Sequence, residues 1–224
     1  MNPEGKIPAA QKLNRYGEIE NIEMTPEDWL NRWKKRQIGF HENKINEKLN
    51  KHLTSLINGR KKIRIFFPLC GKAIDMKWLA DLGHTIVGVE VSELGIKEFF
   101  EEQDLSYTRG PVPEVPGAEV FKSDDGEISL FKCSLFDFTS YATVLISLMG
   151  KGCHYLLDTL VYGESNFIGT PHCVPEHTIQ DLYGQTCNIQ LLESSDALTD
   201  KQRSWGLNSF IENVHLIMLK TDFS

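Results

Sequence analysis

The sequence predicts an α/β domain with a doubly wound, mostly parallel sheet and helices on both of its faces. Two short runs rich in β-branched and aromatic residues, 63–69 and 85–90, have the length and composition of buried strands. Each run is followed by a stretch in which apolar residues recur at helical spacing. Strand, helix, strand and helix in this order are typical of parallel strands joined by crossover helices.

The first residues are expected to form a tail, followed by one domain. Residues 1–23 carry few large apolar side chains, so we predict a flexible N-terminal tail there. The remainder, 24–224, shows no internal repeat and no second region of distinct composition. Its length suits one large domain with a sizeable core.

Two helices are expected ahead of the first strand. Thr25 and Pro26 are typical of the cap and the first position of a helix. Trp29 and Trp33 follow four residues apart, so both indoles share one helix face. Apolar residues at helical spacing predict a second helix over 44–58.

The rest of the chain continues the alternation of strands and helices. Helices are expected from residue 71 to about 80 and again from Ser92, with Gly83 ending the first of them. The elements expected beyond them are a Pro- and Gly-rich loop over 104–118, a hairpin of 120–121 and 128–131, a helix near 140–150, a strand over 155–161, a helix over 175–183, and β segments near 189–192 and 210–219.

Composition narrows the classes of function. The net charge is −7 and no block of basic residues occurs, which argues against nucleic acid or an anionic membrane surface as partner. No apolar run approaches the ~20 residues that a membrane span needs. The five cysteines form no C-x-x-C pair, and the first residues lack the apolar core of a signal peptide. We therefore expect free thiols in a reducing compartment, and a cytoplasmic protein that acts as a monomer on a small molecule.

A ligand site is predicted where the first strand turns into its helix. Ligands of open parallel sheets bind beyond the carboxyl ends of the strands, and Leu69 and Gly71 occupy that position. Glu90 ends the next strand, at about the 20-residue spacing of carboxylates that hold a ribose. A solvated strand-end acid is the alternative interpretation of Glu90.

The kind of turn indicates which adenosine cofactor would bind. A nicotinamide cofactor needs a G-x-G-x-x-G turn for its pyrophosphate, and this pattern is absent, as is G-x-x-x-x-G-K-[ST]. S-adenosylmethionine carries no phosphate, so one glycine is enough. A nicotinamide-dependent oxidoreductase is kept as a disfavoured alternative.

Several long strings resemble the thiopurine S-methyltransferase family. They cover most of the chain from about residue 24: Trp29, Trp33 and Phe40-His41, then Phe66–Ala73, Met76–Trp78, Val87–Ile96, Cys133–Asp137 and Ser204–Gly206. The resemblance implies a Rossmann-like, seven-stranded methyltransferase fold. It also implies methyl transfer from S-adenosylmethionine to an aromatic or heterocyclic thiol.

The resemblance also implies roles for individual residues. Leu69 and Gly71 would line the methionine part of the cofactor, Glu90 the ribose, Ser134 and Leu135 the adenine, and Trp29, Trp33 and Phe40 would form a lid, with Phe40 and Lys201 at the substrate. Aromatic faces attract a soft cation such as a sulfonium. Without the resemblance, the tryptophan pair is also explained as an apolar stripe that docks the first helix.

The expected chemistry needs little from the protein. A thiol of low pKa arrives largely as thiolate, so positioning and exclusion of water can supply most of the acceleration, and no catalytic residue is assigned. Lys201 and Arg203 are candidates to favour the thiolate, although both suit an ordinary surface. Cys70 is interpreted as a packed thiol, and no metal site is expected in the loop around His172 to His177.

The sequence departs from the resembled family after Asp137. The family continues with a fourth strand and an Asp-Arg stretch, whereas residues 138–143 here already lead into the next helix. Strand three and strand four would lie ~14 Å apart in the family's order, and 138–140 reach roughly 10 Å. We expect either shifted strands or an unpaired slot beside the first strand. The alternative function is therefore a shortened, catalytically impaired chain that acts as a weak ligand-binding or interaction protein.

Overall fold

The computed structural model describes residues 24–113, 115–135, 141–163 and 172–220, so the predicted tail over 1–23 and the departure point at Asp137 lie outside the described residues. The helices are α1 (Pro26–Lys34), α2 (Glu47–Ile57), α3 (Asp75–Asp81), α4 (Glu93–Glu102), α5 (Tyr141–Leu148), α6 (Glu176–Tyr183) and α7 (Asp200–Ser204). The strands are β1 (Arg64–Phe67), β2 (Thr85–Glu90), β3 (Tyr107–Pro111), β4 (Glu119–Ser123), β5 (Ile128–Lys132), β6 (His154–Val161), β7 (Cys187–Asp196) and β8 (Ile211–Leu219).

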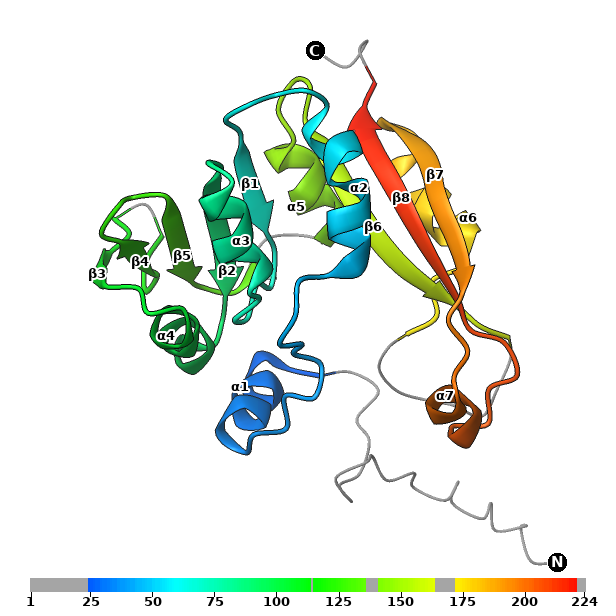
Figure 1. The fold of residues 1–224 in the computed structure, drawn as a ribbon, viewed down its shortest axis with the longest axis horizontal. Helices are drawn as coiled ribbons and strands as arrows, with labels where there is room; N and C mark the ends of the chain where they lie inside the picture. Colours follow the sequence, from blue (N-terminus) through cyan, green and yellow to red (C-terminus); the bar gives the residue numbers. More distant parts are fainter. Residues whose placement is uncertain (1–23, 114, 136–140, 164–171, 221–224) are drawn as a thin grey trace, which may run out of the picture.

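The strands form two sheets rather than one continuous sheet. The first has the order β1-β2-β5-β4-β3, in which β1, β2 and β5 run parallel and β3 and β4 are antiparallel additions. The second has the order β6-β8-β7 and is antiparallel. Figure 1 shows α2 and α5 beside the gap between β1 and β6. The α/β fold is confirmed, and of the two expected outcomes after Asp137 the described residues show the unpaired edge beside β1.

Local signals explain where the first helices begin. The Thr25 side chain accepts a hydrogen bond from the Asp28 N–H, and the Asp28 side chain accepts one from the Thr25 N–H, which is a capping box. The second helix begins later than expected because Asn46 caps it through the Leu49 N–H. Asn58 then ends it in the left-handed region, at φ 51°.

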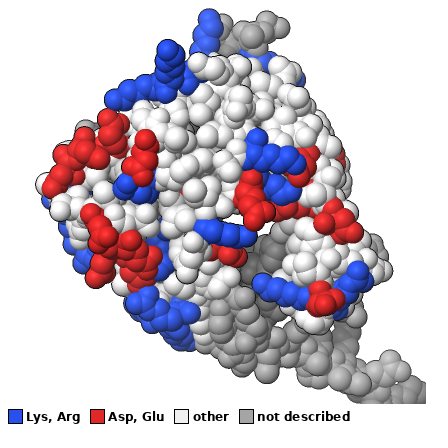
Figure 2. Space-filling view, viewed as in Figure 1, with Lys and Arg blue, Asp and Glu red and all other residues white. Residues whose placement is uncertain are grey.

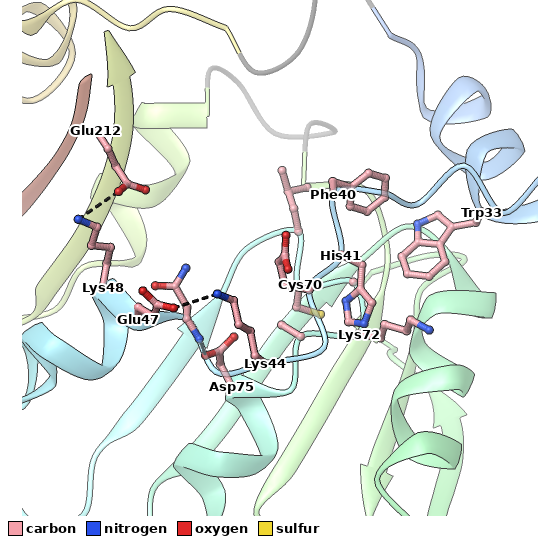
Figure 3. A pocket seen from close by; sticks show the side chains of 15 residues that line it. Trp33, Phe40, His41, Lys44, Glu47, Lys48, Cys70, Lys72, Asp75 and Glu212 are labelled. Carbon is pink, nitrogen blue, oxygen red and sulfur yellow. Dashed lines mark hydrogen bonds and ion pairs between the residues drawn. The ribbon is translucent and has the colours of Figure 1, made fainter. Parts of the chain in front are cut away.

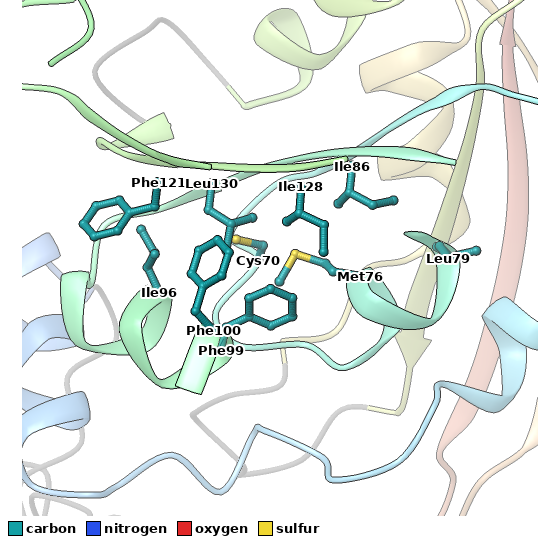
Figure 4. Packing of buried hydrophobic residues seen from close by; sticks show 10 residues of the cluster. All are labelled: Cys70, Met76, Leu79, Ile86, Ile96, Phe99, Phe100, Phe121, Ile128 and Leu130. Atoms are coloured by element: carbon teal, nitrogen blue, oxygen red, sulfur yellow. The ribbon is translucent and has the colours of Figure 1, made fainter. Parts of the chain in front are cut away.

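The core of the first sheet forms between its strands and helices α3 and α4. Figure 4 shows Phe99 and Phe100 of α4 and Met76 of α3 directed toward the side chains of the strands. The buried set comprises Cys70, Met76, Leu79, Ile86, Ile96, Phe99, Phe100, Phe121, Ile128 and Leu130. This packing fixes the β1–α3 and β2–α4 turns at one edge of the sheet, where the ligand site was predicted.

The second sheet has a smaller core of its own. It packs against α5 and α6 through Ala142, Met149, Ile179, Tyr183, Cys187 and Ile217. On the other side, α2 contacts β6 and β8. Within the described residues, no helix has the length and apolarity to span a membrane.

One expectation about local structure was wrong, and one short element was missed. The stretch 104–118, expected to be a loop, contains β3, because β4 offers it a backbone ladder and Arg109 joins Glu119 across the pair at 2.6 Å. Pro111 is tolerated because it ends an edge strand. The short helix α7 was not anticipated, although Thr199 and Gln202 form a capping box at its start.

Candidate functional site

The turn between β1 and α3 has an unusual backbone. Leu69 and Gly71 both adopt positive φ, at 50° each, on either side of the buried Cys70. Glycine takes this conformation readily, whereas leucine does so at a cost of order 1–3 kcal/mol. The Cys70 N–H donates to the Val89 carbonyl at 2.9 Å, which holds the turn against the end of β2. The turn therefore presents Leu69, 48% exposed, at the carboxyl edge of the sheet.

Glu90 connects this turn to the next one. Its Oε2 accepts the Gly71 N–H at 2.9 Å, and its Oε1 accepts the Ser92 N–H at 2.7 Å. Burial raises the pKa of Glu90, because the loss of solvation outweighs the stabilisation by these two N–H groups and that of Val91. The carboxylate is thus oriented by the backbone of two turns, and it retains acceptor capacity for a further donor.

An aromatic cluster covers these turns. The Trp33 indole is 2% exposed and lies over Gly71 and Gly95. A Cβ at Gly95 would come within 2.8 Å of Trp33 Cζ2, so this position requires glycine. Phe40 meets Trp29 and Trp33 edge-on, with centroid distances of 5.7 and 6.0 Å.

A cavity of about 450 Å³ opens beside the turn and the aromatic cluster (Figure 3). Four of the predicted residues line it, namely Trp33, Phe40, Leu69 and Gly71. Basic and acidic side chains from α2, α3, β8 and the preceding loops complete the wall: Glu42, Lys44, Glu47, Lys48, Lys72, Asp75 and Glu212. Its volume suits a small molecule, and one end is aromatic while the other is charged.

Lys72 is the most enclosed cation of the wall, and the sequence analysis did not single it out. Its ammonium contacts Glu98 Oε2 at 3.0 Å and Glu102 Oε1 at 2.5 Å. Glu98 also forms an ion pair with Arg36. Burial opposes the charge, but the two carboxylates raise the pKa of Lys72 above its ordinary value. Lys72 therefore stays charged beneath the cavity.

A second charged group comes from distant parts of the chain. Lys48 of α2 contacts Glu193 at 2.8 Å and Glu212 at 3.1 Å, and Lys51 and His52 also reach Glu193. The basic residues on α2 stand more than 140 positions before the two glutamates in sequence, so no local pattern could reveal the cluster. The cluster holds the N-terminal half of α2 against the second sheet.

His41 directs an unpartnered nitrogen into this region. Its Nε2 is buried and has no hydrogen-bond partner among the described residues. Burial, together with the Lys72 charge, lowers the pKa of His41. The imidazole beside the cavity is therefore neutral at pH 7.

The remaining predicted residues fall into two groups. Glu90 lies behind the lining, and the Cys133 N–H donates to the Glu90 carbonyl at 3.2 Å, which places Ser134 and Leu135 next to the same edge. Lys201 lies on α7, its ammonium 5.7 Å from the Trp205 ring centroid, and it does not line the cavity.

Cys70 is a packed thiol, as expected. It is 6% exposed in the core, and burial raises its pKa well above the ordinary value, so it carries no nucleophilic thiolate at neutral pH. Within the described parts of the chain, no three His, Cys, Asp or Glu side chains are grouped as metal ligands.

Known proteins resemble the chain in sequence and in fold. The sequence model of the thiopurine S-methyltransferase family matches residues 24–140 and 137–220. A probable thiopurine S-methyltransferase of Danio rerio is 45% identical, covering 87% of this chain and 94% of that protein. The thiopurine S-methyltransferase of Lycaon pictus is 43% identical, covering 90% and 92%. A SAM-dependent methyltransferase of Geobacter sulfurreducens, solved with S-adenosyl-L-homocysteine, shares the fold at TM-score 0.51 and 10% identity, covering 89% and 100%.

The comparisons also locate a missing stretch. The two matches to the family meet at 137–140, where the chain departs from the resembled pattern. The alignment to the Danio rerio protein spans 219 positions, and 87% of 224 residues is about 195, so about 24 aligned positions have no counterpart here. The family pattern is therefore interrupted at 137–140, and the chain has fewer residues than the part of this relative that it matches.

Proposed function

Since the chain belongs to the thiopurine S-methyltransferase family, we propose that it transfers the methyl group of S-adenosylmethionine to the sulfur of an aromatic or heterocyclic thiol. The observation that carries this proposal is the pair formed by Gly71 and Glu90 at the carboxyl edge of the sheet, joined at 2.9 Å beneath an aromatic-walled cavity. A solved relative in fold binds S-adenosyl-L-homocysteine, which supports the same cofactor.

The residues present fit S-adenosylmethionine. The N–H groups of Gly71 and Ser92 hold the Glu90 carboxylate, which can still accept hydrogen bonds from the ribose hydroxyls. Ser134 and Leu135 would border the adenine. Leu69 and Gly71 would contact the methionine part, and Trp33, Trp29 and Phe40 would cover the cofactor. When bound, the sulfonium supplies an activated methyl group next to ring faces that favour its charge.

The chain's own contribution is to orient the thiol and to exclude water. Phe40 stands at the cavity with 48% of its surface exposed, so its ring is available to an aromatic substrate. Lys44, Lys48 and Lys72 stand in the lining, each paired with a carboxylate, and an ammonium beside the bound sulfur would favour its thiolate form. Lys201 stays a proposed substrate contact that requires α7 to approach the cavity. In-line positioning of thiolate and methyl group is then the main source of acceleration.

The other proposals follow from the family and from the surface. The family relatives do not favour the catalytically impaired alternative. On the face in Figure 2, Lys and Arg side chains alternate with Asp and Glu, which supports a small molecule rather than nucleic acid as the partner. We propose a monomeric, cytoplasmic enzyme whose single domain spans 24–224.

Calorimetric titration with S-adenosylmethionine, followed by transfer of a labelled methyl group to thiophenol, tests the function. We expect saturable binding and methylated product, with an aryl thiol reacting faster than an alkyl thiol because more of it is thiolate. The Phe40→Ala variant should lower transfer, whereas Leu182→Lys, on the exposed face of α6, should not. Absence of cofactor binding by the folded chain would overturn the proposal.

A further inference from the structure

An open slot separates the two sheets, and we define it as the space between β1 and β6. Among the strands of the described residues, β1 pairs only with β2 and β6 pairs only with β8. Each strand therefore has one backbone edge turned to the slot. Arg60, just before β1, donates from Nη1 to the Gly152 carbonyl, just before β6, at 2.8 Å. The strands thus begin at the same end of the slot and run in the same direction.

The edge of β1 presents backbone groups to the slot at alternate residues. The Ile63 carbonyl accepts the Thr85 N–H of β2 at 3.0 Å, so Ile63 and every second residue after it direct their backbone groups to β2. Arg64 and Phe66 direct theirs the opposite way. No hydrogen bond to these N–H and C=O groups is found within the described part of the chain.

The edge of β6 is open over its first half. The Leu160 carbonyl accepts the Val174 N–H at 2.8 Å, so Leu160 directs its backbone away from β8, and Val174 covers the edge there. By the same alternation, His154, Leu156 and Asp158 direct their backbone groups into the slot. Two rows of donors and acceptors therefore face each other, which is costly if they are left dry and unpaired.

The walls of the slot are mainly apolar. A cavity of about 720 Å³ lies between β1 and β6, bounded by α2 and α5. Leu56, Phe66, Met149 and Leu157 are among the side chains that line it. Leu148 of α5 also lines this cavity, and 58% of its surface is exposed, which is a high fraction for a large apolar side chain.

The relatives have residues at this point that the chain lacks. About 24 positions of the Danio rerio alignment are unmatched, and the family matches meet at 137–140, between β5 and α5. The segment that follows, α5, forms one wall of the slot and leads directly into β6. The slot is therefore the place in the fold where the shortening has its effect.

We propose that the slot between β1 and β6 is a docking site for an extended segment of another polypeptide, which pairs as a β-strand with both edges. Strand addition suits the site because backbone donors and acceptors line both sides, whereas a small apolar ligand would leave them unpaired. Because apolar side chains line the slot on both faces of the docked strand, the docking segment is expected to be a continuous run of β-branched and aromatic residues. The inference goes beyond the proposed function and does not depend on it.

Amide hydrogen exchange of the full chain with a synthetic peptide tests this docking. The probe is the stretch of the Danio rerio protein that has no counterpart here, and the control is the same peptide with two central residues replaced by proline. We expect saturable binding that slows exchange of the Phe66 and Leu156 amides by about tenfold or more, with the proline peptide inactive. Binding without protection of these amides, or no binding, overturns the proposal.

A pair of matched variants separates slot binding from general adhesion. Leu148→Lys places a charge on the slot wall, and because Leu148 is 58% exposed the variant should fold. Leu182→Lys changes an equally exposed leucine, at 48%, on α6 outside the slot. The first variant should weaken peptide binding by about tenfold or more and the second should leave it unchanged. Equal effects of both variants would refute the site.

Discussion

Glu90→Gln separates the structural role of this side chain from its proposed role in cofactor binding. The substitution keeps the shape and removes the charge. The carboxylate accepts the Gly71 N–H at one oxygen and the Ser92 N–H at the other. An amide has one acceptor oxygen, so one N–H loses its partner, which costs about 1–3 kcal/mol.

A second effect opposes this loss. Glu90 is 6% exposed and burial raises its pKa, so its ionised form is less stable in the folded protein than in water. Removing the charge relieves that penalty. We therefore expect a net loss of about 1 kcal/mol in the free energy of unfolding at pH 7. Because the folded pKa is raised, the wild-type protein loses stability as pH rises through the titration, so the difference should be smaller at pH 8 than at pH 5.

Cofactor affinity should fall by more than stability. A hydrogen bond to a charged group contributes about 1.5–3 kcal/mol, which corresponds to about 10- to 150-fold in the dissociation constant of S-adenosylmethionine. Urea unfolding at both pH values and calorimetric titration measure the two quantities, with the exposed Glu101→Gln as control. Unchanged cofactor affinity in a folded Glu90→Gln protein would refute the role assigned to Glu90.

Two further predictions concern the aromatic cluster and the charge at the slot. Gly95→Ala adds a methyl group 2.8 Å from Trp33 Cζ2. The indole, which is 2% exposed in the wild-type protein, should therefore move outward, and its fluorescence should shift to the red. An unchanged spectrum would contradict this packing. Burial and the nearby Glu212 raise the pKa of Asp158 to about 7, so wild-type stability should fall as pH rises from about 4 to 7. Asp158→Asn should remove this fall and gain about 1 kcal/mol at pH 8, with less gain at pH 5, after allowing for solvent screening because the Asp158 side chain is only partly buried. Equal urea midpoints of the two proteins at pH 8 would exclude this effect.

Local chemistry made most elements predictable. The capping box of Thr25 and Asp28 and the cap at Ser92 are contacts between residues three positions apart, so the sequence contains both partners. The strand β3 was missed because its signal comes from pairing with β4 rather than from its own composition, which includes Gly110 and Pro111. Register and partner choice are properties of two segments at once.

The candidate site divides in the same way. Leu69, Gly71 and Glu90 were predictable because a strand end and the spacing to the next strand identify them. Lys48 and Glu212 were not, because their ion pair at 3.1 Å joins α2 to β8. The arrangement of charge around the cavity depends on which elements meet in space.

By itself the sequence determined the family, the strand-to-helix turn at Gly71 and the glutamate that follows it, because each depends on residues close together in the chain. Only the tertiary structure decided what the shortened segment after Asp137 does to the sheet. Hydrogen bonding between strands is set by neighbours in space, and within the part of the chain that the structure describes β1 has a neighbouring strand on one side alone. The sequence left that open edge as one of two outcomes, and its position facing β6 across an apolar slot is a property of the fold alone.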